Sequence, residues 1–106
     1  MKKLFILLFT VCLSVGSLSA QSTDLKKLEQ QASQGDAAAQ TNLGSMYGSG
    51  QGVPQNYVQA HMWFNLAAAQ GNENGKKGRD LVAQMMTPQK IAQAQELARN
   101  WKPKKK

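Results

Sequence analysis

The chain has few of the side chains that support catalysis, metal binding or cross-linking. Its 106 residues contain one cysteine, Cys12, and one histidine, His61. A single cysteine forms no disulfide within the chain, and a zinc site needs three or four converging ligands. The six carboxylates are scattered, and no two of them are spaced as an acid–base pair. We therefore expect no enzymatic activity, no metal and no cofactor.

β-Branched residues are also few after residue 20, and no stretch alternates apolar with polar residues, which argues against strands. Apolar side chains recur instead at three- and four-residue steps, between capping residues and glycine or proline. Gly75 and Gly78 each cost a helix about 1 kcal/mol relative to alanine, so the fourth helix is expected to be the weakest. The predicted helices are Asp24–Gln34, Ala37–Tyr47, Tyr57–Gln70, Glu73–Met85 and a last one from Thr87 to Trp101.

One apolar run stands out near the start of the sequence, from Leu4 to Val15. Two lysines precede it, and small residues ending at Ala20 follow it. This order is typical of a secretory signal peptide that is cleaved after Ala20. A retained membrane anchor is the alternative, although the run is shorter than the roughly 20 residues of a spanning helix. We expect an exported chain, periplasmic or secreted, whose mature part starts at Gln21.

Residues 102–106 read Lys-Pro-Lys-Lys-Lys and form a strongly basic segment. Four lysines and a proline without apolar neighbours predict a disordered tail. Such a tail either stays solvated or contacts an anionic envelope surface or an acidic partner. The tail lacks interleaved aromatic side chains, and export separates the chain from nucleic acid, so we expect no nucleic acid partner.

Two further features have structural explanations. The glycine-rich segment 48–52 follows a helix and contains no lysine, whereas phosphate-binding loops follow a strand and carry a Gly-Lys-Ser/Thr sequence. We therefore expect a turn between two helices. His61 shares a helical stripe with Tyr57 and Phe64, and we expect a structural histidine there and no ligand.

Two similar short segments and a longer motif indicate a helical repeat. The sequence of residues 32–36 is similar to that of residues 68–72, which lie 36 positions later, and this spacing is typical of paired-helix solenoids. Between them, small, aromatic and turn residues occupy a characteristic series of positions: Ala39, Leu43, Gly44, Tyr47, Gly50, Gly52, Val53, Tyr57, Ala60, Trp63, Phe64, Ala67, Ala68 and Gly71. This series closely resembles the Sel-one-like repeat (SLR) family, relatives of the tetratricopeptide repeat with two antiparallel helices per unit.

The resemblance implies an all-α fold, a short α/α solenoid of antiparallel helix pairs that spans residues 21–101. It places one full repeat at about residues 36–71, between two half-repeats. It assigns a concave binding face to the first helix of each pair, and it implies a protein–protein interaction or adaptor module of the cell envelope or secreted space, with an unidentified protein or peptide as partner. Binding of an anionic envelope surface or ligand through the basic tail is the alternative, and self-association stays open. The outward positions on the concave face are Gln40, Thr41, Asn42 and Ser45.

Overall fold

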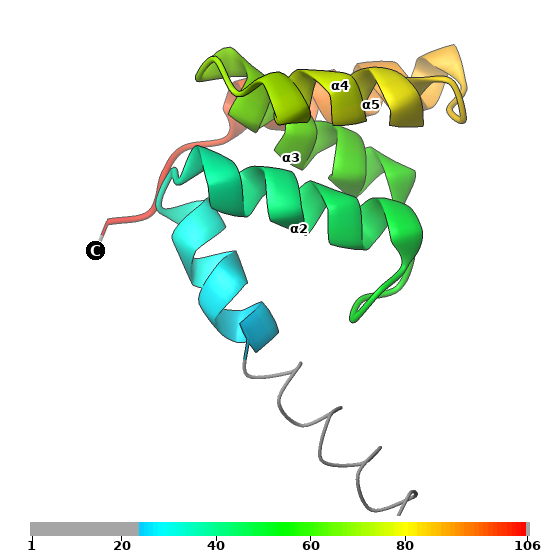
Figure 1. Ribbon diagram of the computed structural model, residues 1–106. Helices are drawn as coiled ribbons and strands as arrows, with labels where there is room; N and C mark the ends of the chain where they lie inside the picture. Colours follow the sequence, from blue (N-terminus) through cyan, green and yellow to red (C-terminus); the bar gives the residue numbers. More distant parts are fainter. Residues whose placement is uncertain (1–23, 106) are drawn as a thin grey trace, which may run out of the picture.

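The computed structural model describes residues 24–105, which form helices joined by short turns, with no strand in that range (Figure 1). The leader predicted at residues 1–20 lies outside the described residues. Each helix agrees with its predicted range to within two residues at either end, so the all-α prediction is confirmed. A first helical segment, residues 24–33, is followed by α2 (Ala37–Ser49), α3 (Tyr57–Ala69), α4 (Glu73–Ala83) and α5 (Pro88–Asn100).

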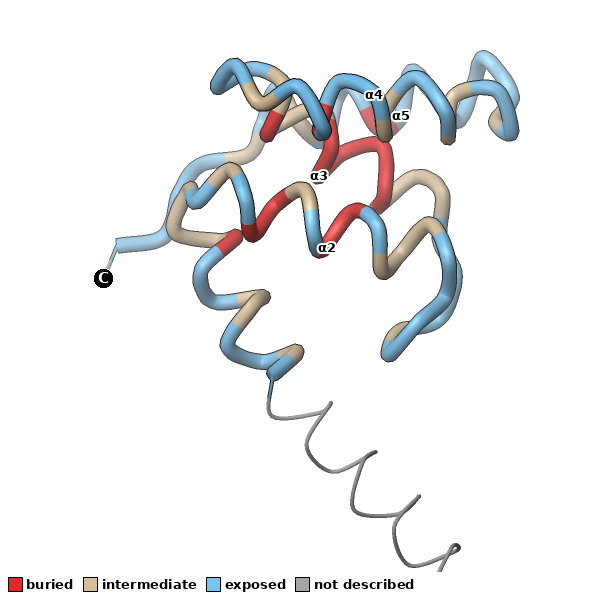
Figure 2. The backbone as a smooth tube through the Cα atoms, in the orientation of Figure 1, coloured by how far each residue is buried: buried red, intermediate tan, exposed pale blue. Residues whose placement is uncertain are grey.

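Consecutive helices run in opposite directions, and the most extensive antiparallel pairs are α2 with α3 and α3 with α4 (Figure 1). The central helix is α3, which packs against α2, α4 and α5, while α2 also reaches α4. Buried residues are concentrated on α2 and α3 (Figure 2). Five successive residues of α3, 60–64, are buried, because neighbours cover this helix on several sides. The arrangement confirms a short solenoid of antiparallel helix pairs.

Each of these four helices begins at a polar residue that the sequence identifies as a cap. The side chains of Asp36, Asn56, Asn72 and Thr87 each accept a hydrogen bond from the backbone N–H three residues later. This bond satisfies one of the free donors at the start of a helix. α2 runs two residues further than predicted and stops at Gly50, whose φ of 75° lies in the left-handed region that favours glycine.

The two similar segments, residues 32–36 and 68–72, form turns with the same hydrogen bonds. In both turns the N–H of the cap residue, Asp36 or Asn72, donates over 3.1 Å to the carbonyl five residues earlier. The glycine before each cap has a positive φ, 105° at Gly35 and 91° at Gly71. Residues with a Cβ atom rarely adopt this conformation. The glycine and the cap recur because each turn has to end one helix and begin the next.

The fourth helix forms in spite of its two glycines, and both of them allow close packing. A Cβ atom added at Gly75 would lie 2.8 Å from the Cβ of Ala67, and one added at Gly78 would lie 2.5 Å from Cε1 of Phe64. Carbon atoms in ordinary contact are about 3.5–4.0 Å apart. The loss of helix propensity is therefore offset by the close approach of α4 to α3.

The segment after α5 folds back onto the first helical segment. Trp101 packs edge-on against Trp63 of α3, with ring centroids 6.3 Å apart. Further along, the backbone N–H of Lys104 donates to the carbonyl of Ser33 over 2.8 Å. Residues 101–105 contain no helix, but this hydrogen bond attaches the basic tail, predicted as disordered, to the body of the protein.

Candidate interaction groove

An open groove of about 560 Å³ runs between α2 and α4, with residues of α3 at its floor. The two helices run in the same direction, because α3, which lies between them in the sequence, runs opposite to both (Figure 1). Their exposed sides form the two walls of the groove. We call this feature the α2–α4 groove.

The α2 wall contains three of the four residues predicted to face a partner, Thr41, Asn42 and Ser45. Thr41 is half-buried, and its hydroxyl donates over 3.1 Å to the side-chain oxygen of Asn72. Asn42 and Ser45 are exposed, and their side chains form no hydrogen bond with other described residues. This wall therefore offers a free amide and a free hydroxyl.

The fourth predicted residue, Gln40, does not face outward, and that part of the prediction is wrong. Its side chain is 0% exposed and points toward the end of the first helical segment. Its amide donates to the carbonyl of Ala32 over 3.1 Å, and its oxygen accepts from the amide of Gln70 over 3.0 Å. The Gln70 amide also donates to the carbonyl of Gly35. Gln40 is thus part of a buried network in which its own amide and that of Gln70 each satisfy one carbonyl group where one helix ends and the next begins.

The floor of the groove is the ring of Phe64, one edge of which fits between two glycine backbones. A Cβ atom at Gly44 of α2 would lie 2.8 Å from Cδ1 of this ring, and one at Gly78 of α4 would lie 2.5 Å from Cε1. Alanine at either position would push the ring or the helix away. The depth of the groove therefore depends on these two glycines.

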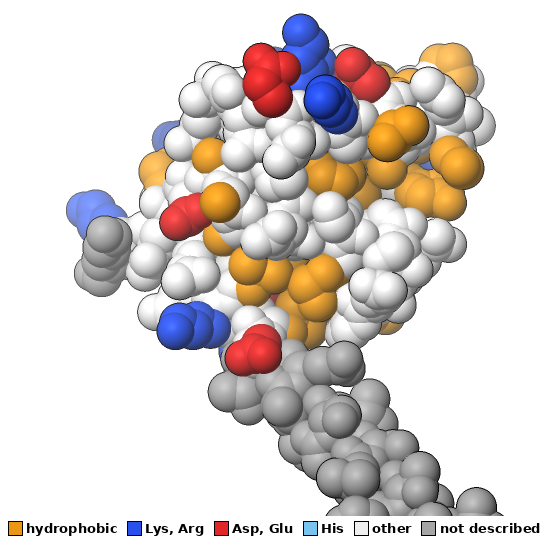
Figure 3. Space-filling view, viewed as in Figure 1, with side chains coloured by type: hydrophobic (Ala, Val, Ile, Leu, Met, Phe, Trp, Pro, Cys, Tyr) orange, Lys and Arg blue, Asp and Glu red, His pale blue; other side chains and the backbone are white. Residues whose placement is uncertain are grey.

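The α4 wall is basic at one end and apolar at the other. Lys77 lines the first part, and Leu81 and Met85 line the second. These two apolar side chains are 64% and 69% exposed, and Figure 3 shows hydrophobic side chains gathered where α4 ends. The hydroxyl of Tyr57, at the start of α3, donates to the Met85 sulfur over 3.7 Å. Exposed apolar side chains beside polar groups are typical of a site that binds another molecule.

The residues of the α4 wall are missing from the sequence prediction, although the repeat period could have identified them. Adding 36 to positions 41, 42 and 45 gives Lys77, Gly78 and Leu81, and all three line the groove. The same helix position in successive units faces the same side of a solenoid. The period thus relates one wall to the other.

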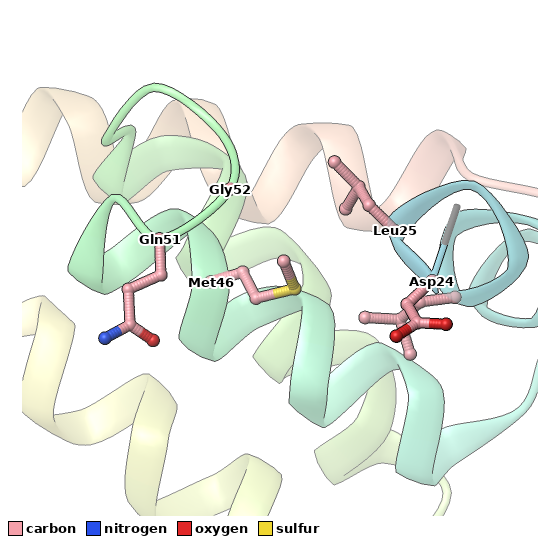
Figure 4. A pocket seen from close by; sticks show the side chains of 6 residues that line it. Asp24, Leu25, Met46, Gln51 and Gly52 are labelled. Carbon is pink, nitrogen blue, oxygen red and sulfur yellow. The ribbon is translucent and has the colours of Figure 1, made fainter. Parts of the chain in front are cut away.

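A second hollow lies between the first helical segment and the loop after α2 (Figure 4). Leu25 and Leu28 line one side, and Met46 extends between them and Gln51 of the loop. This hollow lies off the face shared by α2 and α4. The α2–α4 groove is therefore the candidate site on the face that the resemblance assigns to binding.

His61 is packed inside the protein, as expected from its place on α3. Its side chain is 2% exposed, and its Nδ1 atom has no hydrogen-bond partner among the described residues. Burial lowers the pKa of His61 below 6.5; the positive charge of Arg79 lowers it further, and Asp80 opposes this shift. Within residues 24–105, no three histidine or acidic side chains lie together as metal ligands would. None of the helices described in that range is long and apolar enough to span a membrane.

Comparison with known families assigns the repeat. Residues 37–72 match the family model of the Sel1 repeat, which agrees to within one residue with the predicted unit and confirms the resemblance. Sel1 repeats are generally protein–protein interaction modules built on a non-catalytic helical scaffold. Neither the curated proteins nor the solved structures gave a match to this chain.

Proposed function

We propose that this Sel1-repeat protein is a non-catalytic interaction module that binds a segment of a partner protein in the α2–α4 groove. The observation that carries the proposal is the composition of the two walls. Asn42 and Ser45 offer hydrogen-bonding groups on one side, while Leu81 and Met85 offer exposed apolar surface on the other. A peptide presents backbone polar groups and apolar side chains together, so it can use both walls.

The apolar part of the groove supplies most of the expected affinity. Leu81, near the end of α4, and Met85, in the turn that follows it, are both exposed and line the same groove. Burying a leucine or methionine side chain contributes about 1.5–3 kcal/mol. Because Leu81 is 64% exposed, about two thirds of this contribution is available to a partner, and replacing Leu81 by glutamine should weaken binding roughly five- to thirtyfold. Leu97→Gln on α5, where the leucine is 39% exposed and lies outside the groove, is the matched control.

We further propose that the protein acts after export, in the periplasm or outside the cell. The support is the order of basic, apolar and small residues over positions 1–20. Mass spectrometry of protein recovered from the cell envelope or medium should find an N-terminus at Gln21. A chain that keeps residues 1–20 would favour the retained anchor instead.

Blocking the groove with a long side chain tests the site of binding. Ser45 is exposed, so Ser45→Arg fills the groove without disturbing the core. Gln95→Arg adds the same charge at an exposed residue of α5 away from the groove. Each variant is immobilised and used to retain proteins from an envelope extract.

We expect wild type and Gln95→Arg to retain the same partner and Ser45→Arg to lose it. The partner should then be retained less by Leu81→Gln and equally by Leu97→Gln. Retention that neither groove substitution reduces would place binding elsewhere on the protein and refute the proposal.

A further inference from the structure

Lysine side chains from two distant parts of the sequence meet at a hollow beside the first helical segment. Lys26 comes from that segment, and Lys104 and Lys105 come from the tail. The hydrogen bond from the Lys104 N–H to the Ser33 carbonyl fixes the tail at this place (Figure 1). We call this feature the basic hollow; its uncharged lining residues are Gln30, Ser33 and Gln34.

The lysines of the basic hollow form no ion pair with an acidic side chain among residues 24–105. Among residues 24–105, the one ion pair within 4 Å joins Arg79 and Asp80 on α4. Glu29 is the one carboxylate that lines the hollow, against three lysines. Like charges held together repel one another, and a bound anion relieves that repulsion. The hollow is therefore suited to an anionic ligand.

The kind of anion follows from the donors. Lysine is a compact charge on a flexible stem, whereas arginine pairs with carboxylates in a fixed geometry, and no arginine lines the hollow. The backbone N–H of Lys104 is already used by Ser33. The charges of the hollow are on flexible lysine stems, and its neutral donors, on Gln30, Ser33 and Gln34, are on rotatable side chains. This set of donors suits several phosphate groups at loosely fixed positions better than one small anion or an acidic peptide.

We propose that the basic hollow docks the protein on an anionic phospholipid surface by contacting lipid phosphate groups. The proposal is independent of the α2–α4 groove. It also differs from binding by a free basic tail, because it requires Lys26, which lies far from the tail in sequence. A docked protein would stay at the envelope surface while the groove binds its partner.

Vesicle partitioning of the full chain tests this proposal. The chain is mixed with vesicles of phosphatidylcholine, or of phosphatidylcholine and phosphatidylglycerol at about two to one, so that lysines meet a negative surface. The measured quantity is the ratio of the two partition coefficients, which removes any contribution of the apolar run at residues 4–15. Lys26→Gln is compared with Lys27→Gln, its exposed neighbour, which does not line the hollow.

Each lysine of the hollow should contribute roughly fivefold to the ratio, since a lysine near an anionic surface contributes about 1 kcal/mol. We expect Lys26→Gln to lower the ratio by about that factor, and the tail pair Lys104→Gln with Lys105→Gln to lower it roughly 25-fold. Lys27→Gln should change it much less. Glu29→Gln should raise the ratio, whereas Glu73→Gln, on α4, should not.

Three results would overturn the proposal. Equal losses in Lys26→Gln and Lys27→Gln would mean that net charge alone attracts the protein. A loss in the tail variant with none in Lys26→Gln would mean that the tail acts as a free chain. Saturable binding of inorganic phosphate, abolished by Lys26→Gln, would mean that the hollow is a small-anion site.

Discussion

Replacing Gly78 by alanine should destabilise the protein, although alanine is the better helix former. The exchange gains about 1 kcal/mol of helix propensity in an ordinary helix interior. At Gly78, however, the added Cβ would lie 2.5 Å from Cε1 and 2.6 Å from Cζ of Phe64. These atoms would have to separate by about 1 Å to reach normal contact.

The Phe64 ring has little freedom to give way, because it is 5% exposed and the same edge lies against Gly44 of α2. Overpacking of this kind typically costs about 1–3 kcal/mol. Set against the gain in propensity of about 1 kcal/mol, the expected net loss for Gly78→Ala is up to about 2 kcal/mol. Since 1 kcal/mol shifts the Tm of a domain of this size by about 4–8 °C, thermal unfolding followed by circular dichroism should resolve it.

Gly48→Ala on α2 is the matched control. A Cβ there would meet Val82 at 3.6 Å and Ala60 at 3.8 Å, which is ordinary contact, so the variant should gain up to about 1 kcal/mol. In a Phe64→Leu background, with the ring gone, Gly78→Ala should become neutral or stabilising. If Gly78→Ala stabilised the wild-type protein as much as Gly48→Ala does, the close packing of α4 on Phe64 would be refuted.

Three further predictions concern buried polar groups and a turn. The pKa of His61 is lowered in the folded protein, so the unfolded chain takes up a proton first as the pH falls below 6.5. The free energy of unfolding should therefore decrease by up to about 1.4 kcal/mol per pH unit below that value. Urea unfolding at several pH values should reveal this slope, and His61→Gln should remove its His61 part. Gln40→Ala removes two buried hydrogen bonds, the one to the Ala32 carbonyl and the one from the Gln70 amide, and should cost about 1–3 kcal/mol in urea unfolding. Exposed Gln95→Ala should cost about 0.5 kcal/mol or less. Gly71→Ala should cost about 1–2 kcal/mol of thermal stability, although a Cβ added there would have no atom within 4 Å, because the positive φ disfavours alanine. Gly71→Asn should cost less, because asparagine tolerates a positive φ. Equal losses in the two variants would contradict this conformational cause.

The sequence was sufficient for the helices and turns because their signals are local. Asp36, Asn72 and Thr87 act on the backbone three residues away, and Gly35 and Gly71 act on their own φ angles. Such signals depend little on the rest of the fold. The end of α2 differed by two residues, since several glycines follow one another there and any of them could end the helix.

Contacts between distant residues could not be predicted in the same way. The polarity of Gln40 predicts a surface position, but the side chain is buried because the first helical segment ends beside it. From the sequence, Gly78 is expected only to weaken its helix, but in the structure it makes room for the ring of Phe64. The attachment of Lys104 to Ser33 joins residues 71 positions apart, with no motif at either end.

The residues that specify the fold and those that line the groove walls are largely different sets. This difference explains why a Sel1 repeat indicates an interaction surface but no particular partner. Among the repeat positions, only Tyr57 and Phe64 also line the α2–α4 groove, at its end and its floor. The walls are formed by other residues, among them Ser45, Lys77 and Leu81, which are exposed. These positions are free to vary without loss of the solenoid, so partner choice should change with substitutions there, while substitutions at Phe64 or its glycines should first change stability.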